Sequence, residues 1–331
     1  MSLKQLRGGL TGIPGVRVGH ARHAGGASGV TAVLFDAPVS GAAHLGGDAA
    51  STRQFGALEP AHVNGLIHAI CFAGGSAYGL AAGRGVQEHL EEAGVGLPVS
   101  PGQRVPVVPT AILFDLPVAG AGVRPDAALG RAAAAAASAA PVKEGSVGAG
   151  AGASVGKCAG HALAMKGGVG SVLLQLPTGG RVGALAVVNA FGDVVDPARG
   201  SEIVAGVRRS ERSRRFASTE KLLLGGLATR RYGGGNTTLC LVVTDQPLSR
   251  IGAARVARLA SHGLSRTIRP AETAVDGDLC VVLTTAGKAG DGPEPEELSL
   301  GIAAAEAVSR AILRGVRKAR GLPGLPGLAD R

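Results

Sequence analysis

Apolar residues recur along the chain with two different periods. Short runs rich in Val, Leu, Ile and Ala predict β-strands, and apolar residues at helical spacing predict helices between them. The expected strands are 30–36, 66–73, 107–114, 170–176, 183–190, 238–244 and 278–284, and the expected helices are 76–93, 127–140, 248–267 and 298–318. Prolines and glycines separate these segments, and we find no internal repeat of solenoid length. The alternation of the two periods therefore indicates an α/β protein.

One expected strand has an unusual start. Three glycines, Gly233 to Gly235, and then Asn236 lead directly into Thr237, the residue before the apolar run. Cleavage of the Asn236–Thr237 bond would leave Thr237 with a free α-amine, whose ordinary pKa of about 7.7–8.0 suits it to accept the proton of the neighbouring hydroxyl. Nucleophile and general base would then belong to one residue, as in N-terminal threonine hydrolases. A glycine-rich turn before a core strand explains the same residues, and this segment by itself favours the turn.

Two aspartates further along the chain support the catalytic interpretation. Asp276 and Asp278 flank Gly277 and stand at the start of the strand expected at 278–284. Carboxylates two residues apart point to the same side of a strand or bracket a tight turn. One strand, one helix and a return strand fit between Thr237 and this pair, so the layout predicts that Asp276 lies next to Thr237. An ordinary Asp-Gly turn with solvated carboxylates is the alternative.

Further motifs run nearly from end to end of the chain. They are Gly12–His20, Gly29–Asp36, His68–Leu80, Val105–Asp115, Gly148–Lys157 and Val187–Asp193. Together with the Asn236–Thr237 junction, they resemble the DmpA-type aminopeptidase family, which includes L-aminopeptidase/D-amidases, β-aminopeptidases and the nylon-oligomer hydrolase. The resemblance implies a single domain over residues 1–331. Its expected fold is an α/β layered sandwich, α-β-β-α, of the N-terminal-nucleophile-hydrolase type that ornithine acetyltransferases also resemble.

The resemblance also assigns roles residue by residue. Thr237 matches the nucleophile, and Asp276 and Asp278 match the acidic pair of the threonine-type members, expected to hold Thr237. Lys157 matches a lysine close to the nucleophile, expected to bias the α-amine toward its neutral form. Asn189 matches an asparagine beside the reacting carbonyl and is the expected oxyanion donor of turnover, together with a backbone N–H, each worth roughly 3–4 kcal/mol.

One position of the expected substrate pocket departs from the family pattern. Phe114 stands where some members have a tyrosine, whose hydroxyl helps to bind the oxyanion or the substrate. Phenylalanine cannot donate that hydrogen bond. The contact is therefore absent or is supplied by another group.

The function implied by the resemblance is self-processing followed by amide hydrolysis. Thr237 attacks the Asn236 carbonyl in an N-to-O acyl shift, and hydrolysis leaves an α-chain of residues 1–236 and a β-chain of residues 237–331. The mature enzyme is expected to cleave small peptides or amino-acyl amides without a cofactor, as a homotetramer of associated αβ units. An acyl transferase like ornithine acetyltransferase is one alternative. An uncleaved, non-catalytic binding protein is the other.

The distribution of basic residues bears on whether the protein binds nucleic acid. The net charge of +10 invites a nucleic-acid interpretation, but the basic residues gather between Arg208 and Arg231, where only Phe216 and Tyr232 could stack on bases. We therefore expect a solvated, mobile linker before the junction and no nucleic-acid partner. Glycine makes up 55 of the 331 residues, far above the usual ~7 per cent, and predicts close backbone packing.

Other features favour a cytoplasmic protein without a metal. No apolar run approaches the ~18 residues of a membrane span, and the N-terminus lacks an apolar signal core. His20 and His23 have no third ligand at metal spacing. The cysteines form no Cys-x-x-Cys pair and are expected to be reduced core residues; they are Cys71, Cys158, Cys240 and Cys280.

Overall fold

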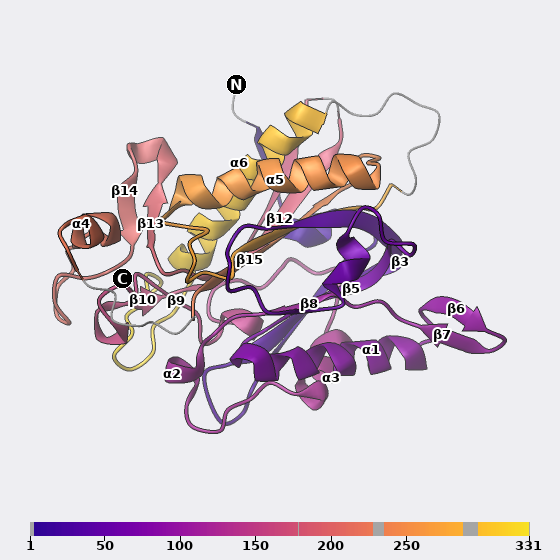
Figure 1. Ribbon diagram of the computed structural model, residues 1–331, viewed down its shortest axis with the longest axis horizontal. Coiled ribbons are helices and arrows are strands. Elements are labelled where there is room, and N and C mark those ends of the chain that lie inside the picture. Colours follow the sequence, from indigo (N-terminus) through magenta and orange to yellow (C-terminus); the bar gives the residue numbers. More distant parts are fainter. Residues whose placement is uncertain (1–2, 178, 228–234, 287–296, 331) are drawn as a thin grey trace.

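Ten strands form one continuous sheet in the computed structural model, which describes residues 3–177, 179–227, 235–286 and 297–330 (Figure 1). Gly233, Gly234, Arg230, Arg231 and Tyr232 lie outside the described residues. The strand order is β1 (Lys4–Leu6), β11 (Gly168–Gln175), β12 (Arg181–Asn189), β15 (Thr237–Thr244), β17 (Leu279–Thr284), β3 (Gly29–Leu45), β5 (Leu66–Ala73), β8 (Thr110–Ile112) and β4 (Thr52–Arg53), and β2 (Val16–Arg22) also pairs with β3.

Short strands and helices surround this sheet. Three small sheets pair β10 (Met165–Lys166) with β9 (Ser154–Val155), β13 (Asp193–Asp196) with β14 (Glu202–Ala205) and β16 (Ile268–Arg269), and β6 (Leu97–Ser100) with β7 (Gln103–Val105). The helices are α1 (Ala82–Glu92), α2 (Leu116–Ala119), α3 (Ala127–Ala135), α4 (Thr219–Leu224), α5 (Arg250–Thr267) and α6 (Glu297–Arg317). The β6–β7 hairpin projects from the body in Figure 1.

The long strand β3 divides the sheet into two layers. Its first part pairs with β2 and β5, and residues 40–45 pair with β17. The register against β5 shifts between Leu34 and Val39, and the intervening Asp36 to Pro38 are exposed. Pro38 cannot donate a ladder hydrogen bond, so it suits this irregular position. The bend carries the chain from one layer to the other.

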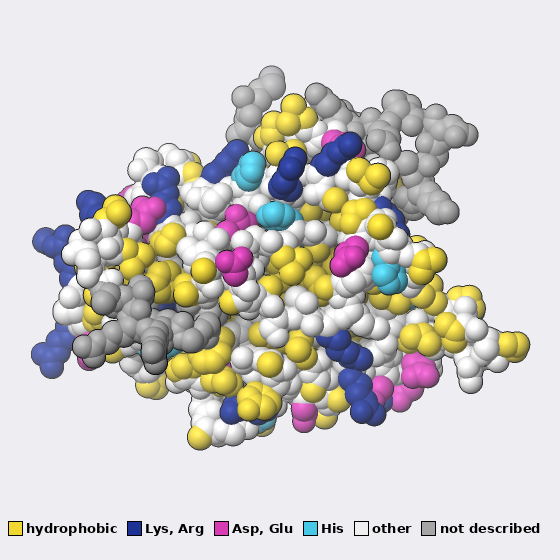
Figure 2. Space-filling view, viewed as in Figure 1, with side chains coloured by type: hydrophobic (Ala, Val, Ile, Leu, Met, Phe, Trp, Pro, Cys, Tyr) yellow, Lys and Arg dark blue, Asp and Glu magenta, His cyan; other side chains and the backbone are white. Residues whose placement is uncertain are grey.

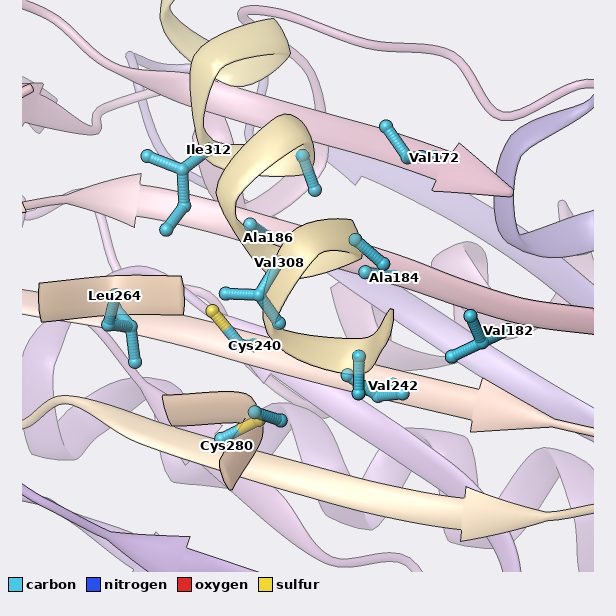
Figure 3. Packing of buried hydrophobic residues seen from close by; sticks show 14 of the residues in the cluster. Val172, Val182, Ala184, Ala186, Cys240, Val242, Leu264, Cys280, Val308 and Ile312 are labelled. Atoms are coloured by element: carbon cyan, nitrogen blue, oxygen red, sulfur yellow. The ribbon is translucent and has the colours of Figure 1, made fainter. Parts of the chain in front are cut away.

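Three apolar cores define the layers. Alternate residues of β12, β15 and β17 face α5 and α6, and the residues between them face the other half of the sheet. Figure 3 shows the first core, where Leu264, Val308 and Ile312 of the two helices pack over Cys240 and Cys280. A third core joins β3 and β5 to α1 and α3. The α-β-β-α order is confirmed.

The expected elements mostly match, with three corrections. The helix expected at 76–93 is α-helical only from Ala82 to Glu92 and follows a 3₁₀ helix at Ser76–Ala81. Only Thr110–Ile112 of the expected strand 107–114 is in the ladder, because Pro106 and Pro109 lack N–H donors and the segment before it contributes carbonyls to β5. The helix expected at 127–140 ends at Ala135. Ser138 instead exchanges backbone hydrogen bonds with Val18 of β2.

The segment expected to be a mobile linker is folded from Gly206 to Leu227. Arg208 is buried, and its guanidinium donates to the Ala162 carbonyl at 2.6 Å. The Ser218 hydroxyl accepts the Lys221 N–H and caps α4. Arg209, Arg212, Arg214 and Arg215 are exposed, as the charge pattern suggested. The prediction of a mobile linker from the density of charged residues was wrong because Arg208 is buried and hydrogen-bonded within the fold.

The high glycine content reflects close backbone contact, as expected. α1 and α3 touch through Gly85 and Gly130: a Cβ atom on Gly85 would lie 1.7 Å from the Ala127 carbonyl oxygen, and one on Gly130 would lie 1.9 Å from that of Ala82. Real Cβ atoms do not approach backbone atoms so closely, so only glycine permits this crossing.

We expect Gly85→Ala to destabilise the protein. The added methyl must push the two helices apart, and overpacking of this kind costs about 1–3 kcal/mol. The thermal midpoint of unfolding measures the effect. Gly56→Ala is the matched control, because a Cβ there meets nothing within 4 Å. Equal midpoints for the two variants would contradict the tight helix crossing.

Candidate active site

The candidate site lies where β15 and β17 begin. These strands are parallel neighbours, with Leu239 opposite Leu279, and α5 connects them across the face of the sheet. Just before the strands, Asn236 and Asp276 form an isolated parallel bridge. The strand–helix–strand layout therefore brings the Asn236–Thr237 junction beside the aspartate segment, as the sequence predicted.

The side chain of Thr237 is buried and in contact with the bond before it. Its hydroxyl donates to the Asn236 carbonyl oxygen at an Oγ1–O distance of 2.5 Å. The same carbonyl oxygen accepts the backbone N–H of Gly277 at 2.7 Å. Since a C=O bond is about 1.23 Å long, Oγ1 lies within about 3.7 Å of the carbonyl carbon. The hydroxyl is thus close to the separation from which attack begins, about 3–3.5 Å.

Asn189 is directly opposite Thr237 in the antiparallel pair of β12 and β15. Its amide oxygen accepts the Ser154 N–H at 3.0 Å and the Lys157 ammonium at 3.1 Å. Its amide nitrogen donates to the carbonyl oxygens of Phe114 and Gly235, both at 3.2 Å. Because the partners on one side are donors and those on the other are acceptors, they fix the orientation of the amide.

Lys157 is completely buried beside Asn189. Its ammonium donates to the Asn189 backbone oxygen at 3.0 Å and to the Gly235 carbonyl at 3.1 Å. The backbone at Lys157 is held to the turn after β12 by a 3.0 Å hydrogen bond to the Phe191 carbonyl. Burial lowers the pKa of Lys157 to about 7, although Asp276 and Asp278 oppose the shift. The amine is therefore able to exchange a proton near neutral pH.

Two donors converge on the Gly235 carbonyl, one residue before the expected cleavage position. They are the Lys157 ammonium and the Asn189 amide, at 3.1 and 3.2 Å. Asn189 is the expected oxyanion donor of turnover, and in the uncleaved chain its amide donates to the Gly235 carbonyl. The ring of Phe114 lies against the same residue, since a Cβ on Gly235 would be 2.9 Å from the ring edge.

The two aspartates are buried and grip the backbone around the junction. Asp278 accepts the Thr238 N–H at 2.5 Å and the Glu272 N–H at 2.9 Å. Asp276 accepts the Thr273 hydroxyl at 2.5 Å. These contacts fix the residue after Thr237 and the loop before β17. The carboxylates therefore position the strand start, while the Thr237 hydroxyl itself donates to Asn236.

Burial also shifts the acidity of this pair. It raises the pKa of Asp278 to about 7, and the neighbouring Asp276 charge adds to the shift. It raises the pKa of Asp276 as well, against the opposing hydrogen bonds from Thr273. Burial and like charge both disfavour the ionised carboxylate. Asp278 and the Lys157 amine thus change protonation within the same range of pH.

A cavity of about 510 Å³ lies near the candidate site in sequence, but none of the site residues lines it. Pro117 to Ala119 follow Phe114, and His161 and Ala162 follow Lys157. The loop Leu322–Leu325 completes one wall. Phe114, expected in the substrate pocket, packs on Gly235.

Sequence reasoning missed three residues that contact the site. They are Gly277, whose N–H donates to the Asn236 carbonyl, Thr273, which donates to Asp276, and Ser154, which donates to Asn189. Gly277 carried a signal, because it lies between the two aspartates. In the described ranges, no group of three or more His, Cys, Asp or Glu side chains is arranged to hold a metal ion.

Comparison with known proteins identifies the family to which the chain is similar. The model of peptidase family S58 matches residues 9–329. An uncharacterized aminopeptidase of Mycobacterium tuberculosis is 40% identical over 347 residues, covering 97% of each chain. A 6-aminohexanoate-oligomer endohydrolase of Paenarthrobacter ureafaciens is 32% identical over 283 residues, covering 82% of this chain and 73% of that protein.

Solved structures of aminopeptidases share the fold. A β-aminopeptidase of Burkholderia superposes with a TM-score of 0.70 at 23% identity, covering 99% of this chain and 93% of that one. The L-aminopeptidase D-Ala-esterase/amidase of Ochrobactrum anthropi, described as a variant of the Ntn hydrolase fold, gives a TM-score of 0.71 at 17% identity, covering 98% and 92%. The layered fold expected from the motifs is therefore shown.

Proposed function

The chain belongs to peptidase family S58, and on that premise we propose that it is a self-processing N-terminal threonine hydrolase. Its substrates are small peptides or amino-acyl amides. The observation that carries the proposal is the 2.5 Å contact between the Thr237 hydroxyl and the carbonyl of the preceding residue, at the start of a central strand. Aminopeptidase is also the printed description of the mycobacterial relative.

Self-cleavage proceeds in two steps. The Thr237 oxygen bonds to the Asn236 carbonyl carbon, its proton passes to a base of the site, and the carbonyl electrons move to the oxygen. Collapse breaks the Asn236–Thr237 C–N bond, the nitrogen takes up a proton as an α-amine, and an ester remains. Water then hydrolyses the ester to the Asn236 carboxylate and the free Thr237 hydroxyl. Lys157, with its pKa near 7, supports the proton transfers.

Turnover uses the groups that cleavage releases. The new α-amine of Thr237 serves as base for its own hydroxyl. When the segment that ends at Asn236 leaves, the Lys157 and Asn189 donors that now hold the Gly235 carbonyl become free for a substrate carbonyl. Asp276 and Asp278 keep the strand start in place. Water then releases the acyl group from Thr237.

Sheet topology supports continued association of the two chains. Strands β15 and β17 of the proposed β-chain lie between β12 and β3 of the proposed α-chain. Separation would break both ladders and open two apolar cores. A homotetramer of such αβ units remains our proposal.

Two other assignments belong to this proposal. None of the helices in the described part of the chain combines the length and apolarity needed to cross a bilayer. The four cysteines, all described, are buried and unpaired, which supports the proposed cytoplasmic location. On the face in Figure 2, Lys and Arg side chains occur in separate groups with Asp and Glu nearby, which supports a site for small molecules over one for nucleic acid.

The first expected result is spontaneous cleavage of the wild-type chain. Intact-mass measurement during incubation should show fragments 1–236 and 237–331 replacing the full-length species, together with hydrolysis of aminoacyl amides. A full-length chain that persists would support the binding-protein alternative. Acetylornithine and glutamate test the remaining alternative, and transfer faster than hydrolysis would favour an acyl transferase.

A further inference from the structure

The backbone N–H of Gly277 points at the oxygen of the bond that is to be cut. Its nitrogen is 2.7 Å from the Asn236 carbonyl oxygen. That distance is within the range of about 2.7–3.1 Å from which a donor stabilises a developing oxyanion. The Thr237 hydroxyl is 2.5 Å from the same oxygen. Nucleophile and electrophilic donor therefore already meet at one carbonyl.

The side-chain donors of the site are engaged elsewhere in the uncleaved chain. Lys157 and Asn189 both donate to the Gly235 carbonyl. Asn189 cannot leave it without losing a network that also includes Ser154 and Phe114. When the acyl shift begins, the negative charge develops on the Asn236 oxygen, where the donor in place is a main-chain N–H.

The local fold fixes this N–H. Asp276 on one side is bridged to Asn236 and its carbonyl accepts the Ala49 N–H at 2.9 Å. On the other side, the Asp278 carbonyl accepts the N–H groups of Gly46 and Gly47. A donor held by its neighbours does not have to reorganise during the reaction. The two aspartates thus flank a rigid donor.

A side chain at position 277 would disturb the nucleophile. A Cβ there would lie 2.8 Å from Thr237 Oγ1, 3.0 Å from the Ala49 carbonyl oxygen and 3.1 Å from Ala50 Cα. The backbone of Gly277 is not in the left-handed region, so its conformation alone does not require glycine. Space for the hydroxyl and the carbonyl does.

We propose that the Gly277 N–H is the oxyanion donor of the self-cleavage step, separate from the Lys157–Asn189 pair that serves turnover. The inference rests on the proposed function. In the acyl shift, the Oγ1–C bond forms, the carbonyl π electrons move to the Asn236 oxygen, and the Gly277 N–H stabilises that charge. When the C–N bond breaks, the electrons return and the N–H again faces a neutral carbonyl.

Replacement of Gly277 by glycolic acid in the full chain tests the donor directly. An ester oxygen then stands where the N–H stood, and no atom is added near Thr237. We expect cleavage to slow roughly 10²–10³-fold, the usual loss for one oxyanion donor. The same replacement at Gly94 is the matched control, since its N–H donates to the Glu91 carbonyl at the remote end of α1. That chain should cleave at the wild-type rate.

Gly277→Ala tests a separate premise of the proposal, that the site has no room for a side chain at position 277. The methyl keeps the N–H but displaces the Thr237 hydroxyl, and misplacement of about 1 Å costs roughly 10²-fold. Gly56→Ala is its control. A wild-type cleavage rate in a folded Gly277 ester would overturn the donor assignment while self-processing stands, and a wild-type rate in Gly277→Ala would contradict the tight packing around the Thr237 hydroxyl. Failure of the wild-type chain to cleave would overturn both.

Discussion

Thr237→Ala should leave the chain uncleaved and without amidase activity. The substitution removes the one hydroxyl that contacts the Asn236 carbonyl among the described residues. Without the acyl shift, no α-amine forms, so nucleophile and base are lost together. We expect both rates to fall at least roughly a thousandfold, to background, as when a nucleophile is deleted elsewhere. Intact-mass analysis and an aminoacyl-amide assay measure the two losses.

Two control substitutions test whether the loss is specific to the Thr237 hydroxyl. Thr238→Ala should process and turn over normally, because the contact of Thr238 with Asp278 is through its backbone N–H and its hydroxyl has no hydrogen-bond partner in the described structure. Thr237→Ser keeps hydroxyl and amine and should stay partly active. Amidase activity in purified Thr237→Ala would mean that another residue is the nucleophile.

The rate of self-cleavage should rise with pH through about 7 and should be nearly abolished in Lys157→Met. Burial lowers the pKa of Lys157 to about 7 and raises that of Asp278 to about 7. Above this pH the lysine is a neutral base and the carboxylate is ionised, so both changes favour the reactive form. Methionine has similar length but neither accepts a proton nor holds Gly235, and we expect a loss of roughly 10²–10⁴-fold.

Asp278→Asn tests the coupling between these groups. The Asp278 charge raises the pKa of Lys157, so its removal should lower that pKa and move the midpoint of the pH–rate profile to more acidic pH. Asp276→Asn should act in the same direction, because Asp276 also raises the Lys157 pKa. Asp36→Asn, at the exposed bend of β3, is the control and should leave the profile unchanged. Both buried variants should impair cleavage more than thermal stability.

Unchanged profiles in the Asp276 and Asp278 variants would reduce the pair to an ordinary turn. Cleavage would then depend on Lys157 and Asn189 without help from the carboxylates. A lower unfolding midpoint with an unshifted pH profile would indicate a purely structural role. Profiles measured with the folded variants separate these outcomes.

Much of the fold was predictable because the strands are apolar on both faces. Runs such as those of β15 and β17 must be covered on each side, which indicates a layered α/β protein. β2 was missed because Gly19 and His20 interrupt its apolar alternation. The structure explains Gly19, since a Cβ there would lie 2.1 Å from the Ala133 carbonyl oxygen under α3.

The site was predictable as a set of residues but not as a set of contacts. The motifs identified Thr237, Asn189 and Lys157, and the strand–helix–strand spacing placed the aspartates nearby. The carbonyl to which each donor bonds depends on the strand register and on the direction of the backbone groups. The identities of the side chains do not specify either of these. For that reason the contact of Asn189 with the Gly235 carbonyl and the identity of the backbone donor, Gly277, could not be predicted.

Because β15 is a central strand of the sheet, we expect the proposed cleavage before it to make unfolding of the protein hard to reverse. In the continuous chain, β12 and β15 belong to one molecule and pair within it. The entropy lost in closing the loop between them grows only slowly with the length of the loop. After cleavage, the same pairing requires two molecules to find each other, so refolding becomes concentration-dependent. Once heat or denaturant has unfolded the two chains, we expect them to reassemble inefficiently at low protein concentration. We therefore expect the lifetime of the proposed two-chain enzyme to depend on its rate of unfolding, and not on an equilibrium between folded and unfolded forms.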